Sequence, residues 1–148
     1  MPDCMPATVH IGGKLRKAKL DELRALLPPT GDLDEAIKEG KPFYGEDGDA
    51  AWGHFPELEE FCRKHNLTYR RTSDAKYEYD GEVVLWQPGM KKPISNAATQ
   101  NGHVYTTVES LRAALDNGDT LRDVVDDLER FTRLIPAFEV VKAKGKRK

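Results

Sequence analysis

The amino-acid sequence predicts an α+β protein: a mixed, largely antiparallel sheet with a three-stranded meander over about residues 67–86, and four to five helices packed mainly on one face. Short segments that alternate apolar and polar residues follow one another without a helix between them, which is typical of antiparallel strands. Other segments repeat apolar residues at helical spacing, with charged residues opposite. The length of 148 residues is ordinary for one domain, and we expect a single globular domain over 1–141.

The first third of the chain contains residues that end secondary-structure elements. Gly12 and Gly13 follow an alternating apolar segment and predict the end of a first strand. Pro28 and Pro29 stop a helix, because proline cannot continue the helical hydrogen-bond ladder, and Asp32 is suited to cap the next helix. We therefore expect a strand over 7–11, a helix over 15–27 and a short helix over 33–39.

The next stretch, from 42 to 53, is aromatic and acidic and lacks a helical period, which predicts a short strand joined to a loop. Pro56 then suits the first position of a helix, since its missing N–H is not needed there. Acidic residues in the first turn of this helix lie at the positive end of its dipole. We expect the helix to end near Asn66.

The clearest strand pattern covers residues 67–86. Asp80 and Gly81 both tolerate positive φ, so this dipeptide predicts a two-residue hairpin turn that pairs Tyr77 with Val84. We expect strands over 67–72, 76–79 and 82–86. In this register one face of the meander carries Tyr77, Tyr79, Val84 and Trp86.

The last third begins with a long polar stretch over 87–102, and loops of this length are usually functional or mobile. Thr106 with Glu109, and Thr120 with Asp123, have the spacing of a capping box, which marks the start of a helix. We therefore expect a strand over 103–106, helices over about 106–116 and 120–134, and a last strand over 137–141.

Positive charge is concentrated at the C-terminal end of the sequence. The formal net charge is −2, yet five basic residues lie within Lys142–Lys148, and the rest of the chain carries 18 basic and 25 acidic residues. An acidic body binds nucleic acid poorly, because phosphate contacts require clustered positive charge. We expect residues 142–148 to form a disordered basic tail.

Several protein classes are disfavoured by composition. No segment reaches the roughly 18 apolar residues needed to span a bilayer, and no signal peptide is visible. The two cysteines, Cys4 and Cys62, do not suggest a disulfide framework, so a reducing, cytoplasmic location is expected. No motif predicts a cofactor.

Two segments are candidates for a catalytic site. Residues 46–54 combine carboxylates with Trp52 and His54, and residues 87–102 are the long polar stretch. Clustered carboxylates suit a hard cation, and a nearby histidine can act as a base. If the chain is a small hydrolase or transferase, these segments should meet in one pocket. No motif marks a nucleophile, so the sequence favours a protein without catalytic activity.

Metal and anion sites are weakly indicated. Cys62 and His65 share an expected helix face, but zinc usually requires four ligands, so we interpret Cys62 as a core residue and predict no metal. Gly12, Gly13 and Lys14, expected between a strand and a helix, form a candidate anion site, because N–H groups at a helix start attract negative charge.

Candidate protein-binding residues gather around the meander, where tyrosine, tryptophan and arginine are typical of interfaces. They are Arg70, Arg71, Tyr77, Tyr79 and Trp86. The alternative is that the aromatic side chains form the core of the sheet. An acidic helix face, formed by Asp119, Asp123, Asp126 and Asp127, is either a solvated surface or a docking patch for a basic partner.

These patterns favour a non-catalytic binding or regulatory module that docks a protein partner, which could be a second copy of the chain. A first alternative is a nucleic-acid-associated protein that makes weak, salt-sensitive contacts through Lys142–Lys148. A second alternative is a small hydrolase or transferase with its site near residues 46–54 and the 87–102 loop.

Overall fold

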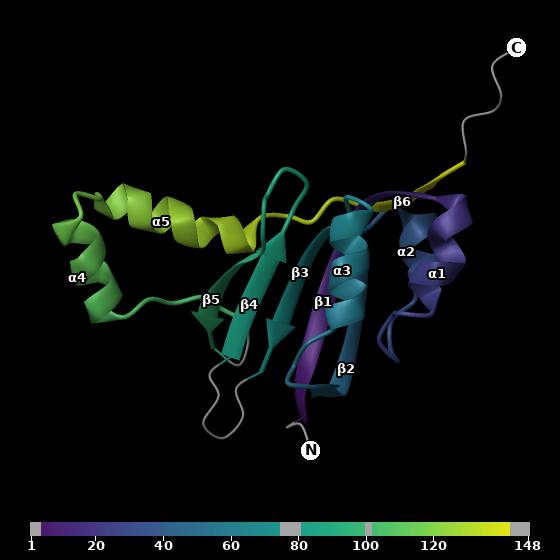
Figure 1. Ribbon diagram of the computed structural model, residues 1–148, viewed down its shortest axis with the longest axis horizontal. Helices are drawn as coiled ribbons and strands as arrows, with labels where there is room; N and C mark the ends of the chain where they lie inside the picture. The colour runs from purple at the N-terminus through teal and green to yellow at the C-terminus, as the bar shows by residue number, and fades with distance from the viewer. Residues whose placement is uncertain (1–3, 75–80, 100–101, 143–148) are drawn as a thin grey trace, which may run out of the picture.

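The computed structural model describes residues 4–74, 81–99 and 102–142. Within these residues the fold is α+β, as predicted, with five α-helices and a six-stranded, largely antiparallel sheet (Figure 1). The strands are β1 (Cys4–Arg16), β2 (Phe43–Ala51), β3 (Thr68–Ser73), β4 (Gly81–Trp86), β5 (Ile94–Ala98) and β6 (Phe138–Val141). The helices are α1 (Leu20–Arg24), α2 (Leu33–Glu39), α3 (Pro56–Lys64), α4 (Val108–Asp116) and α5 (Leu121–Glu129).

The sheet has the strand order β2-β1-β3-β4-β5, and β6 pairs in parallel with the end of β1. The meander is therefore present, but it consists of β3, β4 and β5. Val84 lies opposite Arg71 on one side and Ser95 on the other, so the expected pairing of Val84 with Tyr77 is wrong. The expected middle strand 76–79 and its turn residue Asp80 lie outside the described residues.

Strand β1 continues through Gly12 and Gly13, so the predicted strand end and the helix from residue 15 are both wrong there. A Cβ atom on Gly12 would lie 1.8 Å from the carbonyl oxygen of Pro136. Gly13 has a φ of 115°, which favours glycine. The two glycines thus let β1 pass close beneath the segment that leads into β6, and only a short 3-10 helix, η1 (Lys17–Lys19), separates β1 from α1.

The first face of the sheet is covered by α1, α2 and α3, which agrees with the predicted one-sided packing (Figure 1). Leu23, Leu33 and Leu58 from these helices are buried in one cluster with sheet residues such as Val9 and Tyr69. The second face holds a smaller cluster in which Val83, Leu85 and Ala98 meet Phe131 and Ile135. Phe131 belongs to a second 3-10 helix, η2 (Arg130–Thr132), and Ile135 to the segment after it.

The ends of α2 and α3 follow the local signals in the sequence. The Asp32 side chain accepts a hydrogen bond from the Glu35 N–H at 3.0 Å and so caps α2. Gly40 ends α2 with a φ of 66°, a conformation that favours glycine. Pro56 is the first residue of α3. Local chemistry therefore determines these helix ends.

Residues 87–102 are not one long loop, because β5 lies within them and forms the edge of the sheet. The expected strand over 103–106 is reduced to a single bridge between Val104 and Ala98. After this bridge the chain leaves the sheet and forms α4 and α5, which project beyond β5 (Figure 1). None of the helices in the described residues is long and apolar enough to cross a membrane.

Candidate functional site

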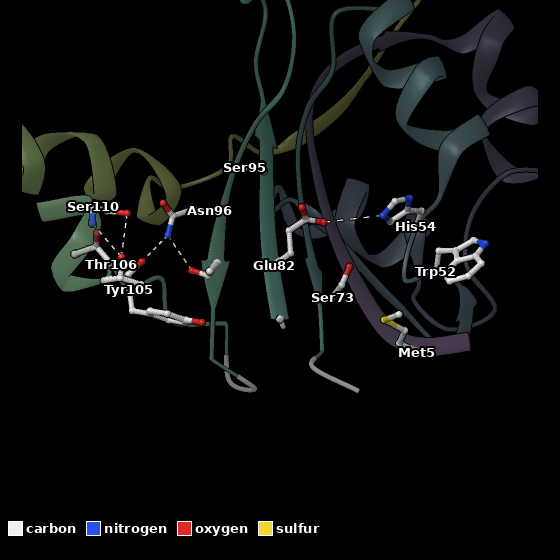
Figure 2. A pocket seen from close by; sticks show the side chains of 13 residues that line it. Met5, Trp52, His54, Ser73, Glu82, Ser95, Asn96, Tyr105, Thr106 and Ser110 are labelled. Atoms are coloured by element: carbon white, nitrogen blue, oxygen red, sulfur yellow. Dashed lines mark hydrogen bonds and ion pairs between the residues drawn. The ribbon is translucent and has the colours of Figure 1, made fainter. Parts of the chain in front are cut away.

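A pocket of about 720 Å³ opens where strands β3, β4 and β5 meet the turn between β2 and α3 and the residues before α4. We call it the arm-base pocket. Its walls include Trp52, His54, Ser73, Glu82, Asn96 and Tyr105 (Figure 2). The wall residues come from separate stretches of the chain, so the pocket is a product of the fold.

The turn between β2 and α3 carries one wall of the pocket. Trp52 and Gly53 both adopt left-handed backbone conformations, with φ of 57° and 68°. A Cβ atom on Gly53 would lie 2.9 Å from the Ser73 side chain, so glycine permits the close approach of this turn to β3. The turn thereby holds Trp52, which is half-exposed, and His54 at the rim.

A buried ion-pair network lies beneath the pocket. Arg71 on β3 is only 4% exposed, and its Nε lies 3.0 Å from Oε2 of Glu59 on α3, which is also buried. The Glu59 carboxylate also accepts the Phe55 N–H at 2.9 Å, at the start of α3. Arg71 in turn donates to the Gly53 carbonyl at 2.9 Å. One arginine thus ties β3 to α3 and to the β2–α3 turn, which positions His54.

Glu82 on β4 connects this network to the pocket. Its Oε1 accepts a hydrogen bond from Arg71 Nη2 at 3.3 Å and lies 4.0 Å from His54 Nε2. His54 and Glu82 point toward each other across the pocket (Figure 2). A histidine beside a carboxylate could accept a proton from a bound molecule, so this pair is the chemical feature of the pocket.

The Ser73 hydroxyl makes its hydrogen bonds within the protein. It donates to the Gly53 carbonyl at 2.6 Å and accepts from Arg71 Nη1 at 2.5 Å. Because Ser73 is buried and both of its hydrogen-bonding roles are filled, it is not poised as a nucleophile. The pocket therefore has a possible base but does not present this serine to a substrate.

The wall opposite His54 is built from β5 and the start of α4. Asn96 Nδ2 donates to the carbonyl of Tyr105 at 2.8 Å, which holds the chain after β5 against the sheet. Thr107 caps α4, because its Oγ1 accepts the Ser110 N–H at 3.1 Å. The cap residue is therefore Thr107, one residue later than the predicted Thr106.

Helices α4 and α5 form what we call the helical arm, residues 108–129. Neither helix contains a buried residue. Val108 is 79% exposed and Leu121 is 68% exposed, and Leu115 and Val125 are also exposed. The arm begins at the pocket wall, since Thr107 and Ser110 line the pocket. The pocket and the arm therefore form one continuous surface.

The two segments proposed for a catalytic site do meet in this pocket. Trp52 and His54 come from the first segment, and Ser95, Asn96 and Ala97 come from the second. The carboxylates of the first segment are elsewhere, on the edge strand β2, where the Asp47 side chain accepts the Asp49 N–H at 2.9 Å. Charged side chains on an edge strand oppose pairing with another sheet.

The candidate binding residues do not form one exposed patch. Arg71 is buried beneath the pocket, and Trp86 is 5% exposed in the core of the first face. Alternation along β3 sends Arg70 to the second face, where its Nη1 donates to the Arg133 carbonyl at 2.7 Å. Tyr77 and Tyr79 lie outside the described residues. The hypothesis that the two arginines and Trp86 share one exposed surface is wrong, because Arg71 and Trp86 are buried on the first face and Arg70 lies on the second.

At the candidate anion site the expected junction between a strand and a helix is wrong, since Gly12, Gly13 and Lys14 belong to the continuous strand β1. Cys62 is fully buried in the first cluster, and burial raises the pKa of its thiol. Among the described residues, no group of three or more histidine, cysteine, aspartate or glutamate side chains is arranged to hold a metal ion.

The sequence predicted the acidic face on the second helix of the arm. It did not predict that large apolar side chains on both arm helices would be exposed. The sequence feature that could have predicted this exposure is the succession of two short amphipathic helices that contain few large apolar residues.

No protein-family model, no curated protein and no solved structure matches the chain. What the pocket and the arm do must therefore follow from their own chemistry.

Proposed function

We propose that this chain is a non-catalytic module that docks a protein partner through the helical arm. The observation that carries the proposal is the exposure of large apolar side chains on both arm helices, at Val108, Leu115, Leu121 and Val125. Where exposed apolar side chains gather into a patch on a folded domain, that patch often marks a binding site. Each such side chain gains about 1.5–3 kcal/mol when it is fully buried.

The spacing of these residues gives each arm helix an apolar stripe. On α4, Val108 and Leu115 are seven residues apart, and on α5, Leu121 and Val125 are four apart. Both spacings place side chains on one helix face. Helices of nine residues are too short to be stable alone in water, so burial against a partner would supply much of their stability.

The charge of the arm defines the chemistry of the partner. Residues 108–129 contain seven carboxylates and two arginines. The apolar stripe is therefore flanked by negative charge, and a complementary partner offers an apolar groove bordered by lysine or arginine. Trp52 and Tyr105, both partly exposed at the adjoining pocket, extend the same surface with aromatic side chains.

The proposal is tested by placing a photo-activatable crosslinking amino acid at Leu121 or Val125 in the full-length chain and identifying the captured protein. We expect capture at both arm positions and not at Lys38 on α2, which serves as the control position. The captured protein should then bind the purified chain, and Leu121→Glu with Val125→Glu should abolish that binding. Binding that survives the double substitution would contradict the proposal.

Self-association is tested with the same variants by sedimentation velocity across the micromolar range. A dimer that the double substitution at Leu121 and Val125 converts to monomer identifies a second copy as the partner. A monomeric wild type combined with a captured heterologous protein identifies a different chain. Hydrogen exchange then localises the contact, because amides of α4 and α5 should become protected on binding.

A small hydrolase or transferase remains a second candidate, favoured by the proximity of His54 and Glu82 within the arm-base pocket. This candidate predicts turnover of activated esters or phosphoesters that His54→Gln abolishes while the free energy of unfolding stays within about 0.5 kcal/mol. Equal turnover by wild type and His54→Gln would remove this candidate. Docking by the arm is independent of that result.

A further inference from the structure

A second pocket, of about 500 Å³, lies where the end of β1 meets the end of α3, and its charged wall residues are all basic. The side chains that form it include Lys14, Arg16, Lys19, Lys64 and His65, and we call it the basic pocket. These residues come from β1, η1 and the C-terminal end of α3. The fold thus gathers cations that are widely separated in the sequence.

Most of these cations lack a local counter-charge. Within the described part of the chain, Lys19 pairs with Glu22 at 3.7 Å, and no carboxylate forms an ion pair with Lys14, Arg16 or Lys64. Glu139 on β6 lies opposite Lys14 in the strand register. The charged residues that line the pocket are nevertheless all basic, although the chain as a whole has a net charge of −2.

His65 provides an independent sign that the pocket suits an anion. Its Nε2 is buried and has no hydrogen-bond partner among the described residues, and its ring lies 4.3 Å from that of Phe61. Burial lowers the pKa of His65, and the charges of Lys19, Lys64 and Arg16 lower it further against the opposing effect of Glu22. His65 therefore lies beside several of the cations that line the pocket, and its buried Nε2 faces no acceptor or donor of the described residues.

The C-terminal end of the chain begins at the same place. Strand β6 pairs in parallel with Gly13–Arg16, so Val141 lies opposite Arg16 and also lines the basic pocket. Lys142 follows directly, and the sequence after it contains Lys144, Lys146, Arg147 and Lys148. In the sequence, the basic segment therefore follows directly after a residue that lines the basic pocket.

We propose that the basic pocket binds the phosphate backbone of a nucleic acid. Several cations gathered in one pocket suit a polyanion, because each neutralised phosphate releases a counterion. A membrane-surface site would combine cations with exposed apolar side chains. The apolar residues in the lining of the basic pocket are Leu15, which is buried, and Val141, which is partly buried, and neither is a large exposed apolar side chain.

The test is fluorescence anisotropy of labelled single-stranded DNA, duplex DNA and single-stranded RNA with the full chain, between about 50 and 200 mM salt. We expect binding at the lower salt to at least one of the three. Lys14→Glu with Arg16→Glu should weaken it at least about tenfold and reduce the slope of log K against log salt by about 2, since two phosphate contacts are lost.

The matched control is Arg112→Glu with Arg122→Glu, which reverses two exposed charges on the arm. We expect this control to change the affinity less than about twofold, because the arm is far from the basic pocket relative to the screening length. Equal weakening by both double variants would overturn the proposal. So would the absence of binding to all three nucleic acids.

Two further measurements separate binding in the basic pocket from binding by the C-terminal residues alone or to a lipid surface. If a chain ending at Lys142 loses all binding while the Lys14 and Arg16 variant keeps it, the folded pocket is not a site. If the chain binds anionic phosphatidylserine vesicles and none of the nucleic acids, the ligand is a lipid surface and the proposal fails. NMR titration should show that nucleic acid raises the pKa of His65, because bound phosphate favours its protonated form.

Discussion

Arg71 on β3 and Glu59 on α3 form a buried ion pair, with Nε and Oε2 3.0 Å apart. Both residues are almost fully shielded from water. Desolvation makes such a pair costly to form, but removal of one partner is costlier because the other charge is left buried. The pair therefore fixes how α3 and the β2–α3 turn sit on the sheet, and with them one wall of the arm-base pocket.

Arg71→Met should lower the free energy of unfolding by about 3–5 kcal/mol, because Glu59 is left as a buried, unpaired carboxylate. Urea denaturation at neutral pH measures the loss. The matched control is Arg24→Met, which removes an ion pair with Asp34 that is largely exposed and should cost at most about 1 kcal/mol. Adding Glu59→Leu to Arg71→Met should recover part of the stability. Similar losses for Arg71→Met and Arg24→Met would argue against this account of the network.

Gly12→Ala should destabilise the protein by about 2–4 kcal/mol, because the added Cβ would clash with backbone and force β1 away from the segment before β6. The control is Gly48→Ala, since nothing lies within 4 Å of a Cβ atom at Gly48. We expect that substitution to stay within about 0.5 kcal/mol of wild type. Thermal and urea unfolding compare the two variants. A neutral Gly12→Ala would mean that β1 and this segment are not in close contact.

The stability of the protein should fall as the pH drops from about 6.5 toward 4, partly through His10. Burial first, and then the charge of Arg70, lower the pKa of His10 from 6.5 to about 4. Between these values the unfolded state binds more protons than the folded state, so the contribution of His10 is complete above pH 6.5 and lost on acidification. The ring of Tyr44 contacts His10, with ring centroids 4.7 Å apart.

His10→Gln should flatten this part of the pH profile by about 1–2 kcal/mol, a figure reduced for the partial exposure of the ring. Asp74 and His10 line one pocket on the sheet, and burial and the charge of Glu46 raise the pKa of Asp74, so its contribution to stability changes with pH in the opposite sense. Asp74 is present in both the wild type and the His10→Gln variant, so its contribution to the pH dependence of stability largely cancels when the two are compared. Urea titrations at several pH values measure the difference, and parallel profiles for the two proteins would contradict the role of His10.

Cys62 should resist thiol reagents in the folded protein. It is fully buried, and burial, followed by the charge of Glu59, raises the pKa of its thiol, so little thiolate is present near pH 8. A Cys4→Ser variant isolates this thiol. We expect reaction with a chromogenic disulfide reagent only after urea is added. Fast labelling in native buffer would show that α3 opens easily from the sheet.

The sequence predicted the local features correctly where one short segment contains all the needed chemistry. Asp32 caps α2, Gly40 ends it and Pro56 starts α3. The capping box of Thr120 with Asp123 is present at the start of α5. In each case the decisive hydrogen bond or φ angle involves residues within one helical turn, so the local sequence is sufficient to specify it.

The sequence did not predict correctly which strands pair with one another. Two glycines after an alternating segment normally end a strand, yet Gly12 and Gly13 continue β1 because they are needed for its close approach to the segment before β6. The sequence predicted that Val84 pairs with Tyr77, which is close to it in the sequence. In the structure β4 lies between β3 and β5, so Val84 pairs with a residue of each of these strands. Strand partners depend on the whole sheet, which no single segment specifies.

The sequence by itself determined an α+β chain whose arm is acidic and whose C-terminal end is basic, because composition and periodicity are properties of the chain alone. Only the tertiary structure decided the environment of each charge. Arg71 is buried and forms an ion pair with Glu59, Arg70 lies on the opposite face of the sheet, and Lys14 and Lys64 line the same pocket. The physical reason is that the energy of a charge depends on its burial and on its neighbours, and both are set by contacts between distant segments.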